Sequence, residues 1–177
     1  MATAREYEKT ALVIGVLSSL EEQHDKLIEI LQSHFGPIEA QSPILDFSFT
    51  DYYDSEMGSR PVRYLLLFKN LVDPSQLASF KTLTHELEKL FAFEHGNRRI
   101  NLDPGILSLS NFILATCKDR SHRIPLRDGI YAETTLIYQA KDFQRLPWTY
   151  ADYSSEDVKV ILRGFRQWLK TELKKQK

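Results

Sequence analysis

The sequence predicts an α/β (α+β) fold: a ferredoxin-like split βαβ core, extended by a C-terminal β-hairpin and a C-terminal helix. Strand-like runs and helical stripes follow each other in the order β-α-β-β-α through the first half, as in the split βαβ plan. A preferred hairpin turn, Asp128-Gly129, stands in the second half, and an amphipathic stripe ends the chain. The 177 residues match the commonest domain size, so we expect one domain over 1–177.

The first strand is expected at Thr10–Leu17, a run rich in Leu, Val and Ile that ends at two serines. Ser18 and Ser19 stand three residues before Glu21 and Glu22, which is the spacing of a capping box at a helix start. The helix that follows is expected to end at Gly36-Pro37. Its apolar face would comprise Leu20, Leu27, Ile28, Leu31 and Phe35.

The next elements are two strands and a second helix. The alternation from Pro43 to Phe49 suits a strand with one wet face, and the polar stretch 50–60 suits a turn. A further strand is expected over 62–72, and Asp73-Pro74 then supplies a cap and a first-turn proline for a helix that runs to His95-Gly96. Its stripe would be Leu77, Phe80, Leu83, Leu87, Leu90 and Phe91.

The second half is less regular. A strand at 99–109 would complete the split βαβ core, whereas 108–116 is apolar and too short to distinguish a helix from a strand. We expect a hairpin over 122–138 and an irregular aromatic segment over 139–153. Ser155 is the expected cap of the last helix, whose apolar face would be Val158, Ile161, Leu162, Phe165, Trp168 and Leu169.

The composition restricts the class of protein. The formal charge of −1 gives no overall field that would attract nucleic acid or an anionic membrane. The first nine residues lack an apolar core, and no apolar run approaches the ~20 residues that span a bilayer. Cys117 is the only cysteine, which excludes an internal disulfide and a cysteine-based zinc cage. We therefore expect a soluble cytoplasmic protein, with Cys117 as a small core residue.

Common catalytic and nucleotide-binding signatures are missing from the sequence. It has no glycine-rich phosphate loop, no G-x-G-x-x-G, no H-E-x-x-H and no G-x-S-x-G. An ordinary P-loop NTPase or dinucleotide enzyme is therefore disfavoured. Polar residues are instead dense between Asn101 and Glu133, which makes this stretch the candidate site.

The expected hairpin brings a histidine and a carboxylate together. With Asp128-Gly129 as a two-residue loop, Ile124 pairs with Glu133, and period two places His122, Tyr131 and Glu133 on one face. His122 and Glu133 then lie roughly 5 to 8 Å apart, close enough to share a proton, a metal or a ligand. Either is a candidate catalytic base, whereas Arg123 would point the other way.

Structural explanations compete with these roles. Glu133 would also fit an edge strand, as a solvated carboxylate or one paired with Arg or Lys. Asp103 precedes Pro104-Gly105, so it would also fit a turn. If Asp103, His122 and Glu133 converge instead, two carboxylates and one imidazole form a set that suits a divalent metal ion with open positions.

Basic residues of the same stretch suggest an anion site. Guanidinium and ammonium groups bind phosphate oxygens well, although solvated surface charge is the alternative for each residue. The candidates for this site are Arg98, Arg99, Lys118, His122 and Arg123. Asn101 and Tyr131 are candidate ligand-binding residues beside them, and a nucleotide or another phosphorylated small ligand is the expected partner.

Two aromatic and acidic segments stand apart from that stretch. The first contains Asp51, Tyr52 and Glu56, which are further candidate ligand-binding residues, and the second runs from Pro147 to Tyr153. Exposed aromatic rings there would stack on a base or grip a partner, or else they close the open side of the sheet. The alternative function is therefore a non-enzymatic protein- or RNA-interaction module.

Taken together, these motifs resemble a bacterial family catalogued as domain of unknown function 4416, over nearly the full length. The resemblance implies no catalytic residues, because the family has no established activity, and some members carry the label GTP-binding protein. This chain lacks both the phosphate loop and the Asn-Lys-x-Asp motif of ordinary GTPases. The segments that carry the resemblance are 49–53, 56–58, 101–105, 118–119, 122–123, 129–133 and 147–150.

Overall fold

The computed structural model describes residues 3–20, 22–47, 54–57, 61–94 and 96–176 and shows a mixed α+β architecture. A 9-stranded sheet has the order β2-β4-β1-β5-β6-β8-β7, with β3 paired to β4 and β9 paired to β8. The strands are β1 (Thr10–Ser18), β2 (Ile38–Gln41), β3 (Leu45–Asp46), β4 (Val62–Val72), β5 (Ile100–Leu107), β6 (Asn111–Thr116), β7 (Ile124–Pro125), β8 (Tyr131–Gln139) and β9 (Asp142–Arg145). The helices are α1 (His24–Phe35), α2 (Asp54–Met57), the 3₁₀ turn η1 (Pro74–Gln76), α3 (Leu77–Lys89) and α4 (Glu156–Lys175).

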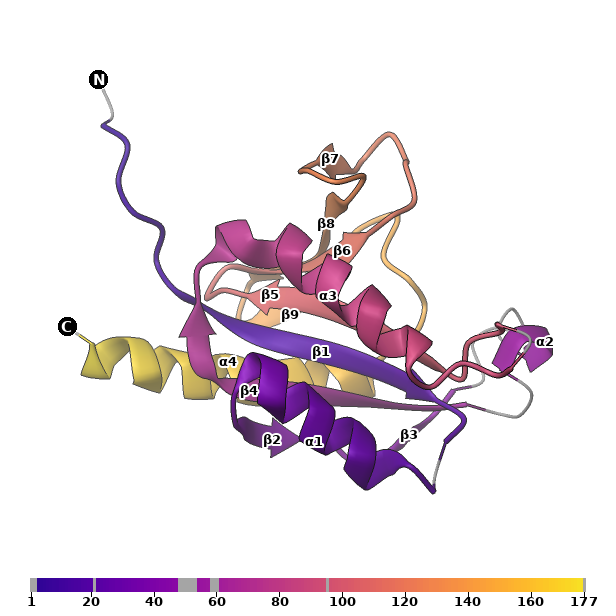
Figure 1. Cartoon of the computed structure of the whole chain (residues 1–177). Coiled ribbons are helices and arrows are strands. Elements are labelled where there is room, and N and C mark those ends of the chain that lie inside the picture. The colour runs from indigo at the N-terminus through magenta and orange to yellow at the C-terminus, as the bar shows by residue number, and fades with distance from the viewer. Residues whose placement is uncertain (1–2, 21, 48–53, 58–60, 95, 177) are drawn as a thin grey trace.

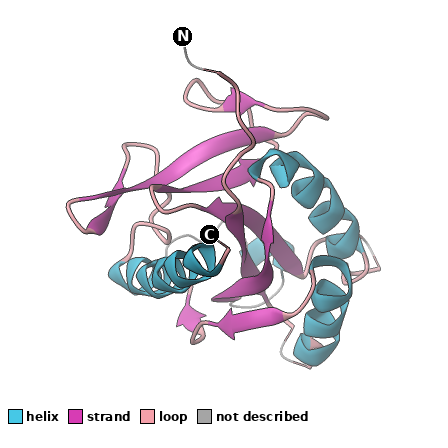
Figure 2. Ribbon diagram, turned by 90° about the vertical axis from the view of Figure 1, so that its left-hand side faces the viewer, coloured by secondary structure: helices cyan, strands magenta, loops and turns pink. Residues whose placement is uncertain are grey.

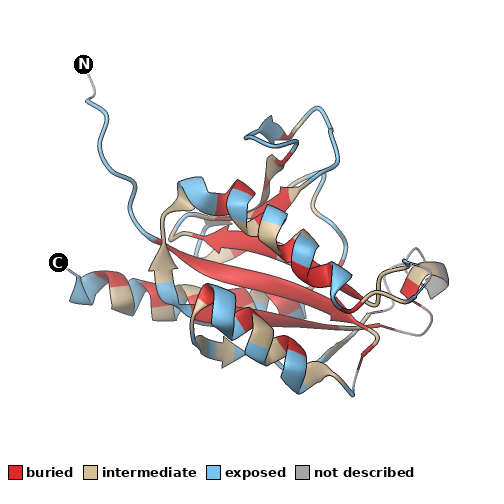
Figure 3. Ribbon diagram, viewed as in Figure 1, coloured by how far each residue is buried: buried red, intermediate tan, exposed pale blue. Residues whose placement is uncertain are grey.

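The sheet is covered on both faces. Helices α1 and α3 lie on one side and α4 on the other, so the molecule has three layers (Figures 1 and 2). The central strand β1 is buried along its whole length, as the red ribbon in Figure 3 shows. Its Leu12, Ile14 and Val16 pack in the core under α1 and α3, whereas Ala11 and Val13 pack in the core under α4. This alternation explains why the strand reads as a continuous apolar run.

The first helix begins later than the sequence predicts. Its N-cap is Gln23, without a side-chain hydrogen bond, so the capping-box prediction is wrong. The Ser18 hydroxyl accepts from the Leu20 N–H, and the Ser19 hydroxyl donates to the carbonyl of Met57, so both hydroxyl groups have partners outside the helix. The helix ends as predicted at Gly36, whose φ of 88° favours glycine.

The region after the first helix differs more from the sequence-based prediction. The strand expected at 43–49 is reduced to the two residues of β3 within the described part, and the strand β2 was not predicted. Of the expected turn at 50–60, residues 50–53 and 58–60 lie outside the described residues, and 54–57 form α2.

The strand predicted at 62–72 is β4, and the cap predicted after it is confirmed. The carboxylate of Asp73 accepts from the Ser75 N–H at 2.8 Å, and Pro74 opens η1, which leads into α3. Helix α3 ends at Lys89 rather than near His95, and Leu90 is 63% exposed instead of belonging to the apolar stripe.

The strand expected at 99–109 is β5, and it runs straight through Asp103-Pro104-Gly105, so the turn expected for these residues is wrong. Gly105 is packed closely against Phe112 on β6. A Cβ at this position would come within 2.7 Å of the Phe112 ring, so a larger residue would clash. The apolar stretch at 108–116, which left helix and strand open, contributes strand β6.

The predicted hairpin forms, but with a register one residue different. Asp128 and Gly129 have φ of 56° and 72°, as a two-residue turn requires. Leu126 and Arg127 both hydrogen-bond with Ile130, so one extra residue separates the turn from β7. Ile124 consequently pairs with Ala132 rather than Glu133.

The C-terminal region combines a confirmed helix with an unpredicted strand. Ser155 caps α4 by accepting from the Val158 N–H, as predicted. The segment expected to be irregular contains β9, which follows a tight turn with positive φ at Ala140 and Lys141. Within the described residues, no helix has the length and apolar character needed to cross a bilayer.

The two halves of the sheet diverge between β5 and β6. These strands pair only from Gly105 to Leu107 on β5, so residues 100–104 have a strand neighbour on one side, β1, alone. Two side chains of α3 replace the missing strand at Leu102: its carbonyl accepts from Lys81 Nζ at 2.7 Å, and its N–H donates to Glu88 Oε1 at 2.7 Å. Pro104, two residues on, has no N–H to satisfy at this edge. A stable opening in the sheet results.

We predict that Gly15→Ala lowers the free energy of unfolding by about 1–3 kcal/mol, because a Cβ on this strand residue overlaps the buried Tyr153 hydroxyl and lies 3.1 Å from Arg63 Nη1. Urea denaturation of the variant tests this. The control is Gly164→Ala in α4, where a Cβ meets nothing within 4 Å and the change is expected to add about 0.5–1 kcal/mol. Equal stability of Gly15→Ala and wild type would contradict the tight packing.

Candidate functional site

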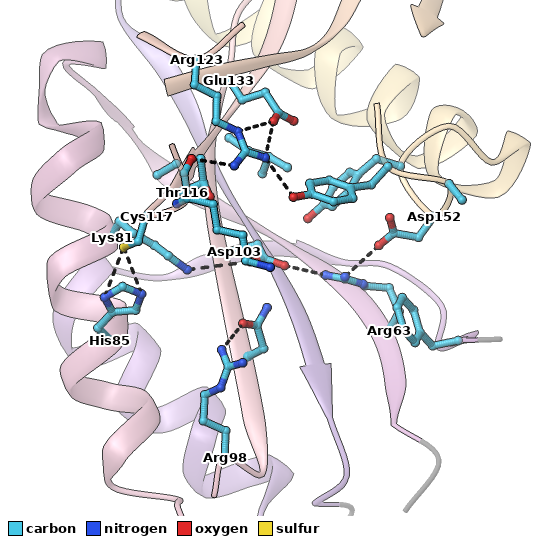
Figure 4. A pocket seen from close by; sticks show the side chains of 18 residues that line it. Arg63, Lys81, His85, Arg98, Asp103, Thr116, Cys117, Arg123, Glu133 and Asp152 are labelled. Carbon is cyan, nitrogen blue, oxygen red and sulfur yellow. Dashed lines mark hydrogen bonds and ion pairs between the residues drawn. The ribbon is translucent and has the colours of Figure 1, made fainter. Parts of the chain in front are cut away.

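The opening between β5 and β6 holds a cavity of about 460 Å³. Its walls come from α3, from β4, β5, β6 and β8, and from the segment 150–153 that precedes α4 (Figure 4). Five basic side chains and three carboxylates line it. These are Arg63, Lys81, Arg98, Lys118 and Arg123, with Asp103, Glu133 and Asp152.

Arg63 is the central cation of the cavity. It projects from β4, is 4% exposed, and donates to Asp103 at 3.1 Å and to Asp152 at 2.8 Å. Burial opposes its charge, but Tyr153 and the two aspartates outweigh this, so the pKa of Arg63 is raised. A buried guanidinium between two carboxylates joins β4, β5 and the segment before α4.

The pKa values of the two aspartates around Arg63 are shifted in opposite directions. Burial alone would raise the pKa of Asp103, but Lys81 at 3.8 Å and Arg63 outweigh it and lower that pKa. Burial raises the pKa of Asp152, and Arg63 offsets this only in part. Asp103 is therefore the firmly ionised partner.

A second ionic cluster occupies the β8 side of the cavity. Glu133 is 1% exposed, and its Oε2 accepts from Arg123 Nε at 2.7 Å and lies 2.6 Å from Arg123 Nη2. His122 Nε2 lies 3.0 Å from the same oxygen, whereas Glu133 Oε1 is buried without a hydrogen-bond partner. Arg123 also donates to the carbonyl of Lys118 and to the hydroxyl of Tyr150. The cluster thus ties the loop after β6 to β8.

Trp148 supports this cluster from outside. Its ring stacks on His122 with a centroid distance of 4.6 Å and an interplanar angle of 12°. The indole N–H donates to the carbonyl of Thr134 at 2.9 Å, which fixes the tryptophan on β8. The imidazole is therefore held between an aromatic ring and a carboxylate.

The remaining polar groups lie at the α2 and α3 sides. Arg98 binds the carboxylate of Glu56 through two nitrogens at 2.7 and 2.9 Å, and donates to Asn101 Oδ1 at 2.9 Å. On α3, His85 lies 3.8 Å from the sulfur of Cys117 through Nε2. Cys117 is exposed at the end of β6, so the expectation of a core cysteine is wrong.

The structure brings many predicted site residues together. His122 and Glu133 are in contact, so their predicted proximity is confirmed, and Asn101, Asp103, Lys118 and Glu133 all line the cavity. Arg123 was expected to point away. It faces Glu133 instead, because the chain turns at Arg120–Arg123, before β7, and does not continue the strand alternation.

Other predicted residues lie elsewhere. Asp51 and Tyr52 lie outside the described residues, Glu56 reaches the cavity only through Arg98, and Arg99 binds Glu22 instead. Tyr131 is not among the described residues that line the cavity.

The residues proposed as metal ligands are not gathered into one group. Asp103 binds Arg63 and Lys81, while Glu133 binds His122 and Arg123. Across the described ranges, no three His, Cys, Asp or Glu side chains form a group that could hold a metal ion.

Sequence reasoning missed Arg63, Lys81, His85 and Asp152. Arg63 interrupts the apolar run of β4, and this interruption was a usable signal, because an arginine in a buried strand requires partners. Lys81 and Glu88 stand seven residues apart, which places both on one face of α3, beside its apolar stripe.

A family model described as domain of unknown function (DUF4416) matches residues 8–168, nearly the whole chain. The matched range includes all the described residues that line the cavity. No curated protein and no solved structure matches the chain significantly.

We predict that Asp103→Asn lowers the free energy of unfolding by roughly 2 kcal/mol at pH 7, because Arg63 and Lys81 lose their shared anion. The folded-state pKa of Asp103 lies below its unfolded value, so its ionised form stabilises the fold above the unfolded pKa. This contribution disappears as the pH falls through the folded pKa. The difference between variant and wild type should therefore shrink below about pH 4.

Urea denaturation at a series of pH values measures this difference. Asp119→Asn, at an exposed position of the loop after β6, is the matched control and is expected to change stability by less than about 0.5 kcal/mol. A constant difference between Asp103→Asn and wild type from neutral to acid pH would show that the charge of Asp103 does not stabilise the fold.

Proposed function

Since the chain belongs to the DUF4416 family, whose description states no activity, we propose from the cavity that this protein binds a nucleotide or another phosphorylated small ligand. The observation that carries the proposal is the gathering of five cationic side chains around one cavity of about 460 Å³. Cavities of roughly 300–1,000 Å³ are the usual size for small-molecule ligands. Positive charge inside such a cavity favours an anionic ligand.

The cations have different parts in this proposal. Arg63 and Arg123 bind carboxylates of the cavity wall and hold its shape, whereas Lys118 is exposed at the loop after β6. An exposed ammonium at the entrance suits the capture of a phosphate group, with Lys81 deeper inside. The aromatic rings of Phe47 and Tyr150 line the same cavity and suit the face of a base.

The histidine and the carboxylate have separate parts in the proposal. Glu133 lines the cavity and is the candidate general base or hydrogen-bond acceptor for the ligand. His122 lies behind it, against Trp148, and acts as a positioning residue for Glu133. A divalent metal ion would arrive with the phosphates of the ligand, where Mg²⁺ keeps most of its ligands from water and phosphate.

The aromatic segment 147–153 supports a small ligand over an interaction module. Trp148 stacks on His122 outside the cavity, and Tyr150 lines the cavity while its hydroxyl accepts from Arg123, so contacts within the protein hold both rings. A partner-binding surface would instead present rings without such contacts.

Two finer proposals accompany this function. The order β5-β1-β4-β2, with α1 and α3 on one face, supports a ferredoxin-like split βαβ core. The free, exposed thiol of Cys117 supports a reducing cytoplasmic location.

The test is a thermal-shift screen of the full chain against inorganic phosphate, nucleoside mono- to triphosphates and sugar phosphates, with and without Mg²⁺. A ligand present at a hundred times its dissociation constant should stabilise the protein by about 2.7 kcal/mol. Calorimetric titration of each active compound then gives its affinity. If none of these compounds stabilises the protein, the ligand-binding proposal fails and the interaction module takes its place.

We predict that Lys118→Ala weakens the binding of the best phosphorylated ligand by about tenfold, which corresponds to the loss of about 1.4 kcal/mol of binding free energy. Lys175→Ala, which removes an exposed lysine at the end of α4, on the other side of the sheet, is the control and should leave the affinity unchanged. Glu133→Gln and His122→Ala are compared in the same titration, with melting temperatures to check the fold. If Lys118→Ala binds the ligand with unchanged affinity, Lys118 does not contact the ligand.

A further inference from the structure

The ion pair between Arg63 and Asp152 is shared by two cavities. The second cavity, of about 300 Å³, lies at the start of α4, and β3 contributes to its wall. Among the described residues, Arg63 and Asp152 are the two that line both this space and the larger cavity between β5 and β6. A change in this ion pair therefore affects both spaces. The residues of the second wall are Ile44, Leu45, Arg63, Asp152, Ser155, Asp157 and Val158.

The two carboxylates that bind Arg63 are held differently. Asp103 lies 3.1 Å from Arg63 Nη1 and 3.8 Å from Lys81 Nζ, so two cations fix it, and its pKa is lowered. Within the described residues, the one ion pair of Asp152 is with Arg63 Nη2, at 2.8 Å on the other side of the guanidinium (Figure 4). Burial raises the pKa of Asp152, and Arg63 and the backbone N–H of Tyr153 offset this only in part. Asp152 is therefore the partner that gives up its charge more readily.

The charges around Arg63 balance before a ligand binds. Arg63 and Lys81 are cations, while Asp103 and Asp152 are anions. A phosphate group that binds Arg63 brings further negative charge into this buried group, where an uncompensated charge is costly. Protonation of one carboxylate removes a negative charge and reduces that cost. Because two cations hold Asp103, this carboxylate is Asp152.

We propose that the phosphate of the ligand takes the place of Asp152 at Arg63 Nη2, and that Asp152 binds a proton as its side chain turns into the second cavity. This inference rests on the proposed binding of a phosphorylated ligand and adds its regulation by pH. A guanidinium suits the exchange, since it binds carboxylate and phosphate oxygens with the same forked geometry. Arg63 keeps Asp103 as a partner throughout, so its charge is never buried alone.

The groups around the second cavity favour a neutral Asp152 there. Asp157 of α4 lines this cavity, and its negative charge opposes a second ionised carboxylate beside it. Apart from Arg63, the described part of this wall holds no basic side chain that would keep Asp152 ionised. The charged and titratable groups around Asp152 are thus Arg63 on β4, Asp103 on β5, Tyr153 in the same segment and Asp157 on α4.

The experiment titrates the full chain with inorganic sulfate, which, unlike phosphate, remains a dianion across the pH range of the test. Calorimetry in buffers of different ionisation enthalpy gives the number of protons taken up for each sulfate bound. We expect the wild type to take up about one-half to one proton near pH 6. Because the proton and the anion bind together, the sulfate affinity should rise by up to about tenfold for each pH unit of acidification.

The variant Asp152→Asn removes the charge and keeps the shape of the side chain. It should take up no proton and should bind sulfate about tenfold more tightly than the wild type at pH 7, because no ionised carboxylate competes for Arg63. His85→Gln should keep the proton uptake, since the proton goes to Asp152. Glu172→Gln, near the end of α4, is the matched control for loss of a carboxylate and should behave as the wild type does. Melting temperatures check that each variant is folded.

Three results would overturn the exchange. These are sulfate binding by the wild type without proton uptake, equal uptake in Asp152→Asn and the wild type, and uptake that His85→Gln abolishes. In each case sulfate still binds, so the ligand-binding function stands without the exchange. If sulfate does not bind at any pH, the exchange at Arg63 fails as well, and the thermal-shift screen with the phosphorylated compounds decides the ligand-binding function separately.

Discussion

The buried guanidinium of Arg63 is the interaction on which the site depends. Arg63 lies on β4, and its two carboxylate partners come from β5 and from the segment before α4, 40 and 89 residues further along the chain. A buried charge without partners is strongly unfavourable, so these three parts of the chain are held in one arrangement. The same ions line the cavity, and its shape is therefore set by the pairing that keeps Arg63 buried.

The local features of the fold could be predicted from the sequence where the interactions are local. Asp73-Pro74 starts a helix through a bond to Ser75, Ser155 caps α4 through Val158, and β4 has its predicted bounds, because each signal lies within a few residues. The serines before α1 resemble a cap equally well. Ser19, however, has partners 38 and 80 residues away, and no local pattern reveals contacts at that separation.

The candidate site was predictable in part for the same reason. His122 and Glu133 are joined by a hairpin, so their proximity followed from the turn residues, although the extra residue before the turn changed the register. Arg63, Lys81 and Asp152 belong to other elements, and only the order of the strands brings them to the cavity. Arg123 was misplaced because strand alternation was extended to a residue that precedes β7. Sequence periodicity predicts which residues share one face of a helix or strand. It does not predict where two strands of a sheet separate, and the cavity lies at such a separation, between β5 and β6.

The opening between β5 and β6 also bears on how the protein avoids association with other chains. An unpaired strand edge is a template for a strand from another molecule, which leads to aggregation. At Leu102, however, both backbone groups of that edge are already bound by Lys81 and Glu88, and Pro104 offers no donor. At Leu102 a foreign strand would find neither a free donor nor a free acceptor, and at Pro104 it would find no donor. The gap in the sheet therefore leaves room for small molecules, while the backbone at Leu102 and Pro104 disfavours pairing with another strand.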